Sequence, residues 1–395
     1  MRSSTSMGGL GVSRPDVALV SPYPPPGPRH AGNSGVASYT ANLAHALRDA
    51  GAKVTVVAPS EGGVPPVVDE DGVRVERPFT RGARALPAAA RAAIRTGAPT
   101  VHLQHELFLY GGPASLTGLG EALGRLRRSS ARSVVTCHQV VDHRRVDRSF
   151  TDLHRVRVPV SVARGGLAAV QGLIGRLADV VVVHEQAFAD TLGCARVVPH
   201  GVEVVEPLAA DHARTWLGLA PDRLVVLCFG FIAPYKGFES ALDAAGEAGD
   251  GVDLVVAGGE HPRLAAAGDT YARDLARRYG SVARFTGFVP GEDVPRWFSG
   301  ADLALLPYPR PFSASGALAL ALAYGLPVLL SPEMAEAMGA PASISATPAE
   351  LGERLAKLAA DRSGLDPMRQ VSAQIASERS WPAVARQHML LYEGV

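Results

Sequence analysis

The feature that most constrains the fold is a repeated alternation of short apolar runs with longer segments of helical periodicity. An apolar run of four to six residues predicts a strand buried on both faces, and strands that alternate with helices predict parallel βαβ units. We therefore expect an α/β protein with parallel sheets. The clearest runs are VALV (17–20), TVHLQ (100–104), DVVVVH (179–184), LVVLCF (224–229) and LPVLLS (326–331).

These runs are too numerous for one sheet of ordinary width, and 395 residues exceed what one core usually holds. We predict two Rossmann-like domains whose parallel sheets face each other across a cleft, joined near 203–215. The expected boundaries are a tail at 1–14, an N-terminal domain at 15–205 and a C-terminal domain at 206–375. The last segment, 376–395, is predicted as an amphipathic helix that can pack back on the N-terminal domain.

Composition narrows the class of partner. Lys and Arg total 39 against 38 Asp and Glu, so no excess of positive charge points to nucleic acid. The three cysteines lack the paired spacing of a disulfide framework or a zinc site. The start of the chain has no apolar leader segment, and no run of 18 uncharged apolar residues occurs. We expect a cytoplasmic enzyme, with peripheral contact at the inner face of a membrane left open.

A glycine-bearing loop follows the first predicted strand. It contains Gly32, Asn33 and Gly35 and leads into a helix at about 35–50. Backbone N–H groups of such a loop can approach an anion at the helix N-terminus. A plain capped turn explains the same residues equally well.

Histidines end three of the predicted strands in the first half. His105 is followed by Glu106, and His138 and His184 end two later strands. One histidine at a strand end is usually structural. The carboxyl ends of parallel strands share one edge, however, so three together favour the polar wall of a site. A zinc site would need closer histidine spacing, and we expect no metal.

A lysine stands at the equivalent edge in the second half. In VVLCFGFIAPYKGF, Gly230 ends the strand and a helix begins at 238, so Lys236 lies where open α/β sheets bind ligands. The spacing is not that of a P-loop. The lysine is either a solvated loop charge or a cation that neutralises a diphosphate leaving group.

A second loop of the same half leads into a helix that begins near Ser313, Ser315 and Gly316. Hydroxyls and free N–H groups at a helix start can hold phosphate, or they simply cap the helix. Because this loop and Lys236 belong to the same half, we favour a phosphate site.

Two further patterns have simpler explanations. The D-x-D pattern at 69–71 precedes a glycine and a strand-like run, so a hairpin turn is favoured over a metal-bound diphosphate. Residues 142–176 hold seven arginines against three aspartates. A solvated face is favoured there over a surface for an anionic membrane or lipid phosphate.

Taken in order along nearly the whole chain, these motifs resemble the retaining glycosyltransferases of the GT-B fold, family 4. FGFIAPYKGF is similar to the phosphate-binding turn of that family, FTGFVP to its nucleobase loop and LQHE to its active-site histidine. The resemblance implies metal-independent transfer of a hexosyl group from a nucleotide-diphosphate sugar to an unknown acceptor hydroxyl, without a cofactor. It implies catalytic roles for His105 and Lys236, donor binding by Gly32, Gly35, Gly230, Lys236, Phe288, Val289, Ser313, Ser315 and Gly316, and a cleft lined by Asn33, Glu106, His138 and His184.

One departure from the family is clear. The E-x7-E positions fall on Phe312 and Leu320, both apolar, whereas LLPYPRPFSASG resembles a branch with a Ser-Gly pattern. Ribose recognition is therefore expected to differ. A non-catalytic sugar-nucleotide-binding subunit stays open as an alternative. A sugar-nucleotide epimerase would need more carboxylates in the cleft than Glu106 and Glu185 supply.

Overall fold

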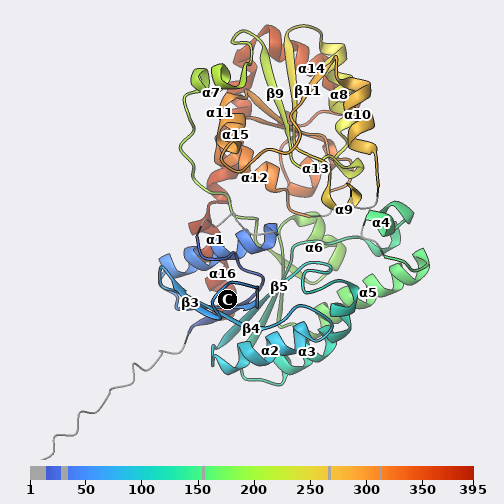
Figure 1. The fold of residues 1–395 in the computed structure, drawn as a ribbon. Coiled ribbons are helices and arrows are strands. Elements are labelled where there is room, and N and C mark those ends of the chain that lie inside the picture. Colours follow the sequence, from blue (N-terminus) through green and yellow to red (C-terminus); the bar gives the residue numbers. More distant parts are fainter. Residues whose placement is uncertain (1–14, 28–33, 154–155, 266–267, 312) are drawn as a thin grey trace, which may run out of the picture.

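The computed structural model describes residues 15–27, 34–153, 156–265, 268–311 and 313–395. Two α/β domains are stacked one above the other, and the chain passes between them (Figure 1). The expected class, two domains built on mainly parallel sheets, is confirmed.

The described part of the N-terminal domain contains an eight-stranded sheet of order β3-β4-β2-β1-β5-β6-β7-β8, parallel except for β3. The antiparallel pair β3–β4 turns at Asp71 and Gly72, so the hairpin predicted for the D-x-D pattern is confirmed. The strands are β1 (Val17–Val20), β2 (Val54–Pro59), β3 (Val67–Glu70), β4 (Val73–Phe79), β5 (Thr100–His105), β6 (Arg132–Cys137), β7 (Val180–Val183) and β8 (Ala195–Val197).

Helices cover both faces of this sheet. Apolar residues of α2, α3, α5 and α6 form one buried cluster with the strands, and α1 forms another on the opposite face. The helices are α1 (Gly35–Asp49), α2 (Ala85–Arg95), α3 (Leu119–Arg127), α4 (Arg148–Leu153), α5 (Val160–Leu177) and α6 (Gln186–Leu192), with 3-10 turns η1 (Pro113–Gly118) and η2 (His143–Arg145).

The C-terminal domain has a parallel sheet of order β11-β10-β9-β12-β13 in its described residues. Its strands are almost wholly apolar, as burial on both faces requires. They are β9 (Leu224–Phe229), β10 (Val252–Ala257), β11 (Ala283–Phe285), β12 (Leu303–Leu306) and β13 (Val328–Leu330).

Helices surround this second sheet (Figure 1). They are α7 (Ala210–Leu217), α8 (Phe238–Ala248), α9 (Pro262–Ala265), α10 (Tyr271–Tyr279), α11 (Val294–Gly300), α12 (Gly316–Ala323), α13 (Pro332–Met338), α14 (Pro348–Ala360) and α15 (Leu365–Glu378), with 3-10 turns η3 (Pro234–Lys236), η4 (Ala342–Ile344) and η5 (Arg362–Gly364). No helix in the described ranges is long and apolar enough to span a bilayer.

The last helix, α16 (Trp381–Glu393), lies against α1 of the N-terminal domain (Figure 1). Its Trp381 and Val384 are buried in that domain's core. The chain therefore crosses between the domains twice. The two crossings lie side by side, because Val202 N–H donates to the Arg379 carbonyl at 2.7 Å.

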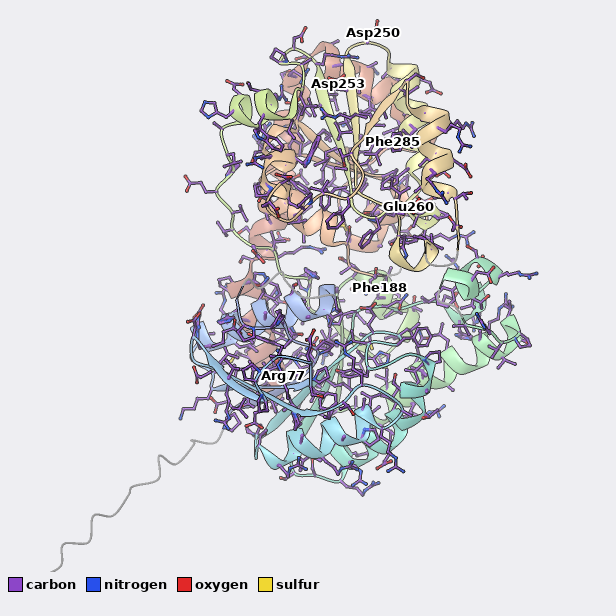
Figure 2. All side chains as sticks on the ribbon, in the orientation of Figure 1. Arg77, Phe188, Asp250, Asp253, Glu260 and Phe285 are labelled. Carbon is purple, nitrogen blue, oxygen red and sulfur yellow. The ribbon has the colours of Figure 1, made fainter. Side chains whose placement is uncertain are left out.

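The direction of β10 orients the second sheet. Asp253, near the start of β10, lies toward the outer end of the domain, whereas Glu260, just beyond its end, lies toward the N-terminal domain (Figure 2). Since the strands are parallel, all their carboxyl ends face the N-terminal domain, and the loops that follow them stand at the boundary between the domains.

Candidate active site

Lys236 occupies a tight turn at the carboxyl end of β9. It ends η3, and Gly237 follows with φ +63° as the residue that precedes α8. A Cβ atom on Gly237 would lie 2.4 Å from the Pro307 carbonyl oxygen, so only glycine fits. The turn is thereby held against the neighbouring strand β12, and its lysine is directed inward.

The ammonium group of Lys236 is buried without a counter-ion. Only 9% of the residue is exposed, and it forms no ion pair with any residue that the structure describes. Its Nζ donates a 3.4 Å hydrogen bond to the Phe229 carbonyl and faces the Tyr308 ring at 5.4 Å. Burial lowers the pKa of this lysine. A buried cation with so little compensation favours an anionic ligand.

Two glycines make room for this lysine. A Cβ atom on Gly230, whose φ is +106°, would lie 2.5 Å from Lys236 Nζ. A Cβ atom on Gly258 would lie 2.1 Å from the Gly230 carbonyl oxygen. The ends of β9 and β10 therefore approach closely beside the lysine.

The N-terminus of α12 faces the same space. Ser315 is its N-cap, and its Oγ accepts a 3.2 Å hydrogen bond from Leu318 N–H. A cavity of about 130 Å³, which we call the Lys236 cavity, is lined by Tyr235, Lys236, Tyr308, Arg310, Pro311, Ser313, Ala314, Ser315, Gly316 and Ala317. Its lining therefore combines cations, hydroxyls and free N–H groups of a helix start, which is the chemistry that binds phosphate.

The predicted nucleobase loop lies farther along the same sheet edge. Phe288 is 72% exposed, whereas Val289 is buried. A Cβ atom on Gly259 would lie 3.2 Å from the Phe288 backbone N, so the loops after β10 and β11 pack backbone to backbone. The exposed ring is available to a planar ligand.

The loop before α12 contacts the N-terminal domain. Ser313 forms an isolated antiparallel bridge with Gln139, the residue that follows His138. Arg310 Nη1 lies 3.6 Å from Asp147 Oδ2. His138 and the Lys236 cavity are therefore near neighbours across the domain boundary.

His105 is buried with both ring nitrogens unpartnered. It ends β5, is 3% exposed, and neither Nδ1 nor Nε2 bonds any group in the described residues. Burial lowers its pKa to about 4, so the ring is neutral at pH 7 and offers one donor and one acceptor. Glu106 follows it and is partly exposed.

His138 and His184 bond each other instead of standing free. His184 Nδ1 donates to the Val198 carbonyl at 3.0 Å, and its Nε2 lies 3.1 Å from His138 Nδ1. On the other side of the His138 ring, Nε2 lies 2.8 Å from Gln104 Oε1. His184 is fully buried, so it can act on the site only by holding the His138 ring in place.

Sequence reasoning missed the ring that organises these histidines. Tyr39, on α1, contacts His138 at 4.7 Å, His200 at 5.1 Å and Trp381 at 5.2 Å between ring centroids. It joins the first helix, the segment after β8 and α16. The sequence carries a weak signal for it, since an aromatic side chain in the first turn and a half of α1 must face the sheet.

The remaining predicted residues are less informative. Gly35 is the first residue of α1, after the N-cap Ser34. Gly32, Asn33 and Phe312 lie outside the described residues. No group of three or more histidine, cysteine or acidic side chains that could hold a metal occurs in the described ranges.

Comparison with known families matches both domains. Residues 34–209 match the family described as Glycosyl transferase 4-like domain, and residues 223–361 match the family described as Glycosyl transferases group 1. The first match covers most of the N-terminal domain, and the second contains Lys236 and the start of α12.

Curated relatives match over a shorter stretch. The D-inositol 3-phosphate glycosyltransferases of Mycobacterium ulcerans (strain Agy99) and Mycobacterium marinum (strain ATCC BAA-535 / M) are each 38% identical over 116 residues. That alignment covers 28% of this chain, and the chain spans only 24% of the length of these relatives.

Solved structures match over almost the whole chain. Sucrose-phosphate synthase from Thermosynechococcus elongatus has a TM-score of 0.72 at 20% identity, covering 96% of this chain and 99% of that one. Anabaena HepE in complex with UDP-glucose has a TM-score of 0.66 at 17% identity, covering 96% and 99%. At these identities the likeness shows the fold, and it confirms the expected GT-B architecture.

Proposed function

Because the chain belongs to the family 4 group of GT-B glycosyltransferases, we propose that it moves a hexosyl group from a nucleotide-diphosphate sugar to an acceptor hydroxyl, with retention at the anomeric carbon. The observation that carries this proposal is Lys236, a buried cation that has no counter-ion among the described residues and lies beside the N-terminus of α12. A donor diphosphate supplies the missing negative charge.

The proposed chemistry follows from where charge develops. The bond between the anomeric carbon and the donor phosphate breaks, and its electron pair stays on the diphosphate. Lys236 and the free N–H groups at the start of α12, which begins at Gly316, would stabilise that negative charge. The acceptor oxygen bonds the anomeric carbon on the same face, and its proton passes to the departing phosphate oxygen. This scheme requires neither a metal nor a cofactor.

His105 is proposed to hold the donor sugar. Neither ring nitrogen has a partner among the described residues, so both can bond sugar hydroxyls once donor binding exposes them, and the lowered pKa keeps the ring neutral. A neutral ring can donate to one hydroxyl and accept from another. His138 is committed to Gln104 and His184, so its contribution would be to shape the wall beside Ser313.

The experiment that tests the function is a donor screen. The purified protein is incubated with UDP-, GDP-, ADP- and dTDP-sugars, and nucleotide release is measured with sugar-alcohol, glycan and inositol phosphate acceptors. UDP-glucose is tried first because HepE, which shares the fold, is described in complex with it. We expect activity that EDTA leaves unchanged, and a requirement for added Mg²⁺ or Mn²⁺ would contradict the scheme.

The matched variants are Lys236→Ala and Lys357→Ala. Lys357 is 72% exposed on α14, so its loss should leave turnover unchanged, whereas loss of Lys236 should lower it at least about a hundredfold. Nucleotide binding without turnover would favour a non-catalytic subunit. A changed sugar configuration in the recovered donor would favour the epimerase.

A peripheral membrane contact is a further part of the proposal. Helices α4 and α5 project from the side of the N-terminal domain (Figure 1), and Val158 and Val162 are 43% and 56% exposed there. Arg157 and Arg164 are exposed nearby. Such a surface suits anionic lipid headgroups. Co-sedimentation with phosphatidylglycerol vesicles, but not with phosphatidylcholine vesicles, is the expected result.

A further inference from the structure

Arg310 is the second cation of the Lys236 cavity. It lies on the loop between β12 and α12 and lines the cavity together with Lys236, Ser313 and Ser315. No carboxylate belongs to that lining among the described residues. A nucleotide diphosphate carries more than one negative charge, and Lys236 can balance only one of them.

In the structure, Arg310 faces the opposite domain. Its Nη1 lies 3.6 Å from Asp147 Oδ2, and the two side chains are 74% and 49% exposed. The other carboxylate oxygen of Asp147 accepts a 2.9 Å hydrogen bond from Phe150 N–H at the start of α4. Asp147 is therefore held in place by the backbone, whereas the guanidinium is largely exposed to solvent.

An ion pair this exposed is weak. Pairs of solvent-exposed side chains contribute little to stability, because water and salt screen them. A guanidinium that forms two parallel hydrogen bonds to phosphate in a partly enclosed cavity gains considerably more. Exchange of partner from Asp147 to a diphosphate is thus favourable.

Resting on the glycosyltransferase function proposed above, we propose that Arg310 is a donor-binding residue that changes partner across the domain boundary. Without ligand it pairs with Asp147. When a nucleotide diphosphate enters the Lys236 cavity, the guanidinium turns to the phosphates and releases Asp147. Donor binding thereby removes a contact that joins this loop to the N-terminal domain, whereas the Gln139–Ser313 bridge stays in place.

The test measures UDP binding by calorimetry, with GDP, ADP and dTDP as alternatives if another base binds better. Arg310→Gln should weaken binding at least about tenfold and reduce its dependence on salt, with Arg310→Lys intermediate. Asp147→Asn should tighten binding about two- to fivefold, because the competing carboxylate is gone. The exposed pair Arg145–Asp142, at 3.7 Å, supplies the control Arg145→Gln, which should change nothing.

The double variant identifies partner exchange. In the Arg310→Gln background, Asp147→Asn should no longer tighten binding, since the two residues act through one interaction. If Asp147→Asn has the same effect with or without Arg310, or if Arg310→Gln binds UDP normally while Lys236→Ala does not, partner exchange is wrong and the function stands. If no nucleotide diphosphate binds the unaltered protein, both proposals fail.

Discussion

A Cβ atom on Gly230 would lie 2.5 Å from Lys236 Nζ, so the glycine and the lysine occupy adjoining space that admits no side chain. The glycine also has φ +106°, a conformation that other residues adopt only with strain. The position of the buried ammonium group therefore depends on the absence of a side chain at residue 230.

We predict that Gly230→Ala weakens donor binding by at least about tenfold, because the methyl group displaces the ammonium group from the Lys236 cavity. The measurement is the dissociation constant for UDP, together with the midpoint of urea unfolding. Gly62→Ala is the control, since Gly62 has open space around its Cβ position and no positive φ. Normal UDP binding by Gly230→Ala would show that the lysine position is unimportant.

Two serines allow the capping role of Ser315 to be separated from ligand binding. Ser315 caps α12 and Ser331 caps α13, each accepting a 3.2 Å hydrogen bond from a backbone N–H. Either change to alanine should lower the free energy of unfolding by about 0.5–2 kcal/mol. Ser315→Ala should also weaken UDP binding, and more than Ser331→Ala does, because Ser331 is outside the Lys236 cavity and reaches its lining only through a 2.6 Å hydrogen bond to the Tyr308 carbonyl. Equal effects of both variants on UDP affinity would mean that Ser315 caps α12 and does not bind the ligand.

Much of the fold follows from local pattern. Strands such as β9 and β12 are continuous apolar runs, and burial on both faces makes their boundaries and parallel pairing readable from sequence. The glycines at 230 and 237 mark the turn that holds Lys236, because positive φ and close backbone approach leave no alternative.

The contacts that sequence could not reveal join residues far apart in the chain. Glu185 and Arg379 are separated by 194 positions, and Tyr39 and His388 by 349. Neither pair leaves a periodic signal. The pairing of His138 with His184 likewise depends on side-chain direction within adjacent strands, which strand ends alone do not specify. The ion pair of Arg310 with Asp147 also joins two distant segments, so no local pattern predicts it.

The ion pair between Glu185 and Arg379 leads to a prediction about stability. It is bidentate, at 2.7 and 2.8 Å, and its side chains are 7% and 11% exposed. It joins the start of α6 to the chain that crosses toward α16. Glu185→Gln leaves a buried charge unpaired and should lower the free energy of unfolding by about 3–5 kcal/mol.

The double variant Glu185→Leu with Arg379→Met provides the contrast. Two apolar side chains leave no unpaired charge, so this protein should be more stable than Glu185→Gln. Urea unfolding of the unaltered protein, of Glu185→Gln and of the double variant measures the order of their stabilities. A double variant that is the least stable of the three would mean that the charges themselves contribute net stability at this junction.

Buried histidines make the protein sensitive to mild acid. Burial lowers the pKa of His184 to about 3, of His200 to about 4 and of His388 to about 3, against an ordinary value of 6.5. In the unfolded chain these rings take up protons as pH falls through 6.5, while the folded protein keeps them neutral. Stability from this source is therefore complete above pH 6.5 and is lost as pH falls toward 4.

Each such histidine contributes a slope of up to about 1.4 kcal/mol per pH unit below 6.5. We expect the free energy of unfolding in urea to fall clearly between pH 7.5 and 5.5, a range in which unperturbed carboxylates stay ionised. His388→Gln removes one titrating ring. It should reduce the slope of the unfolding free energy against pH by up to about 1.4 kcal/mol per pH unit. His200→Gln replaces it if His388→Gln folds poorly. The same unfolding free energy at both pH values would mean that the rings are protonated inside the folded protein, because only then do folded and unfolded states bind equal numbers of protons.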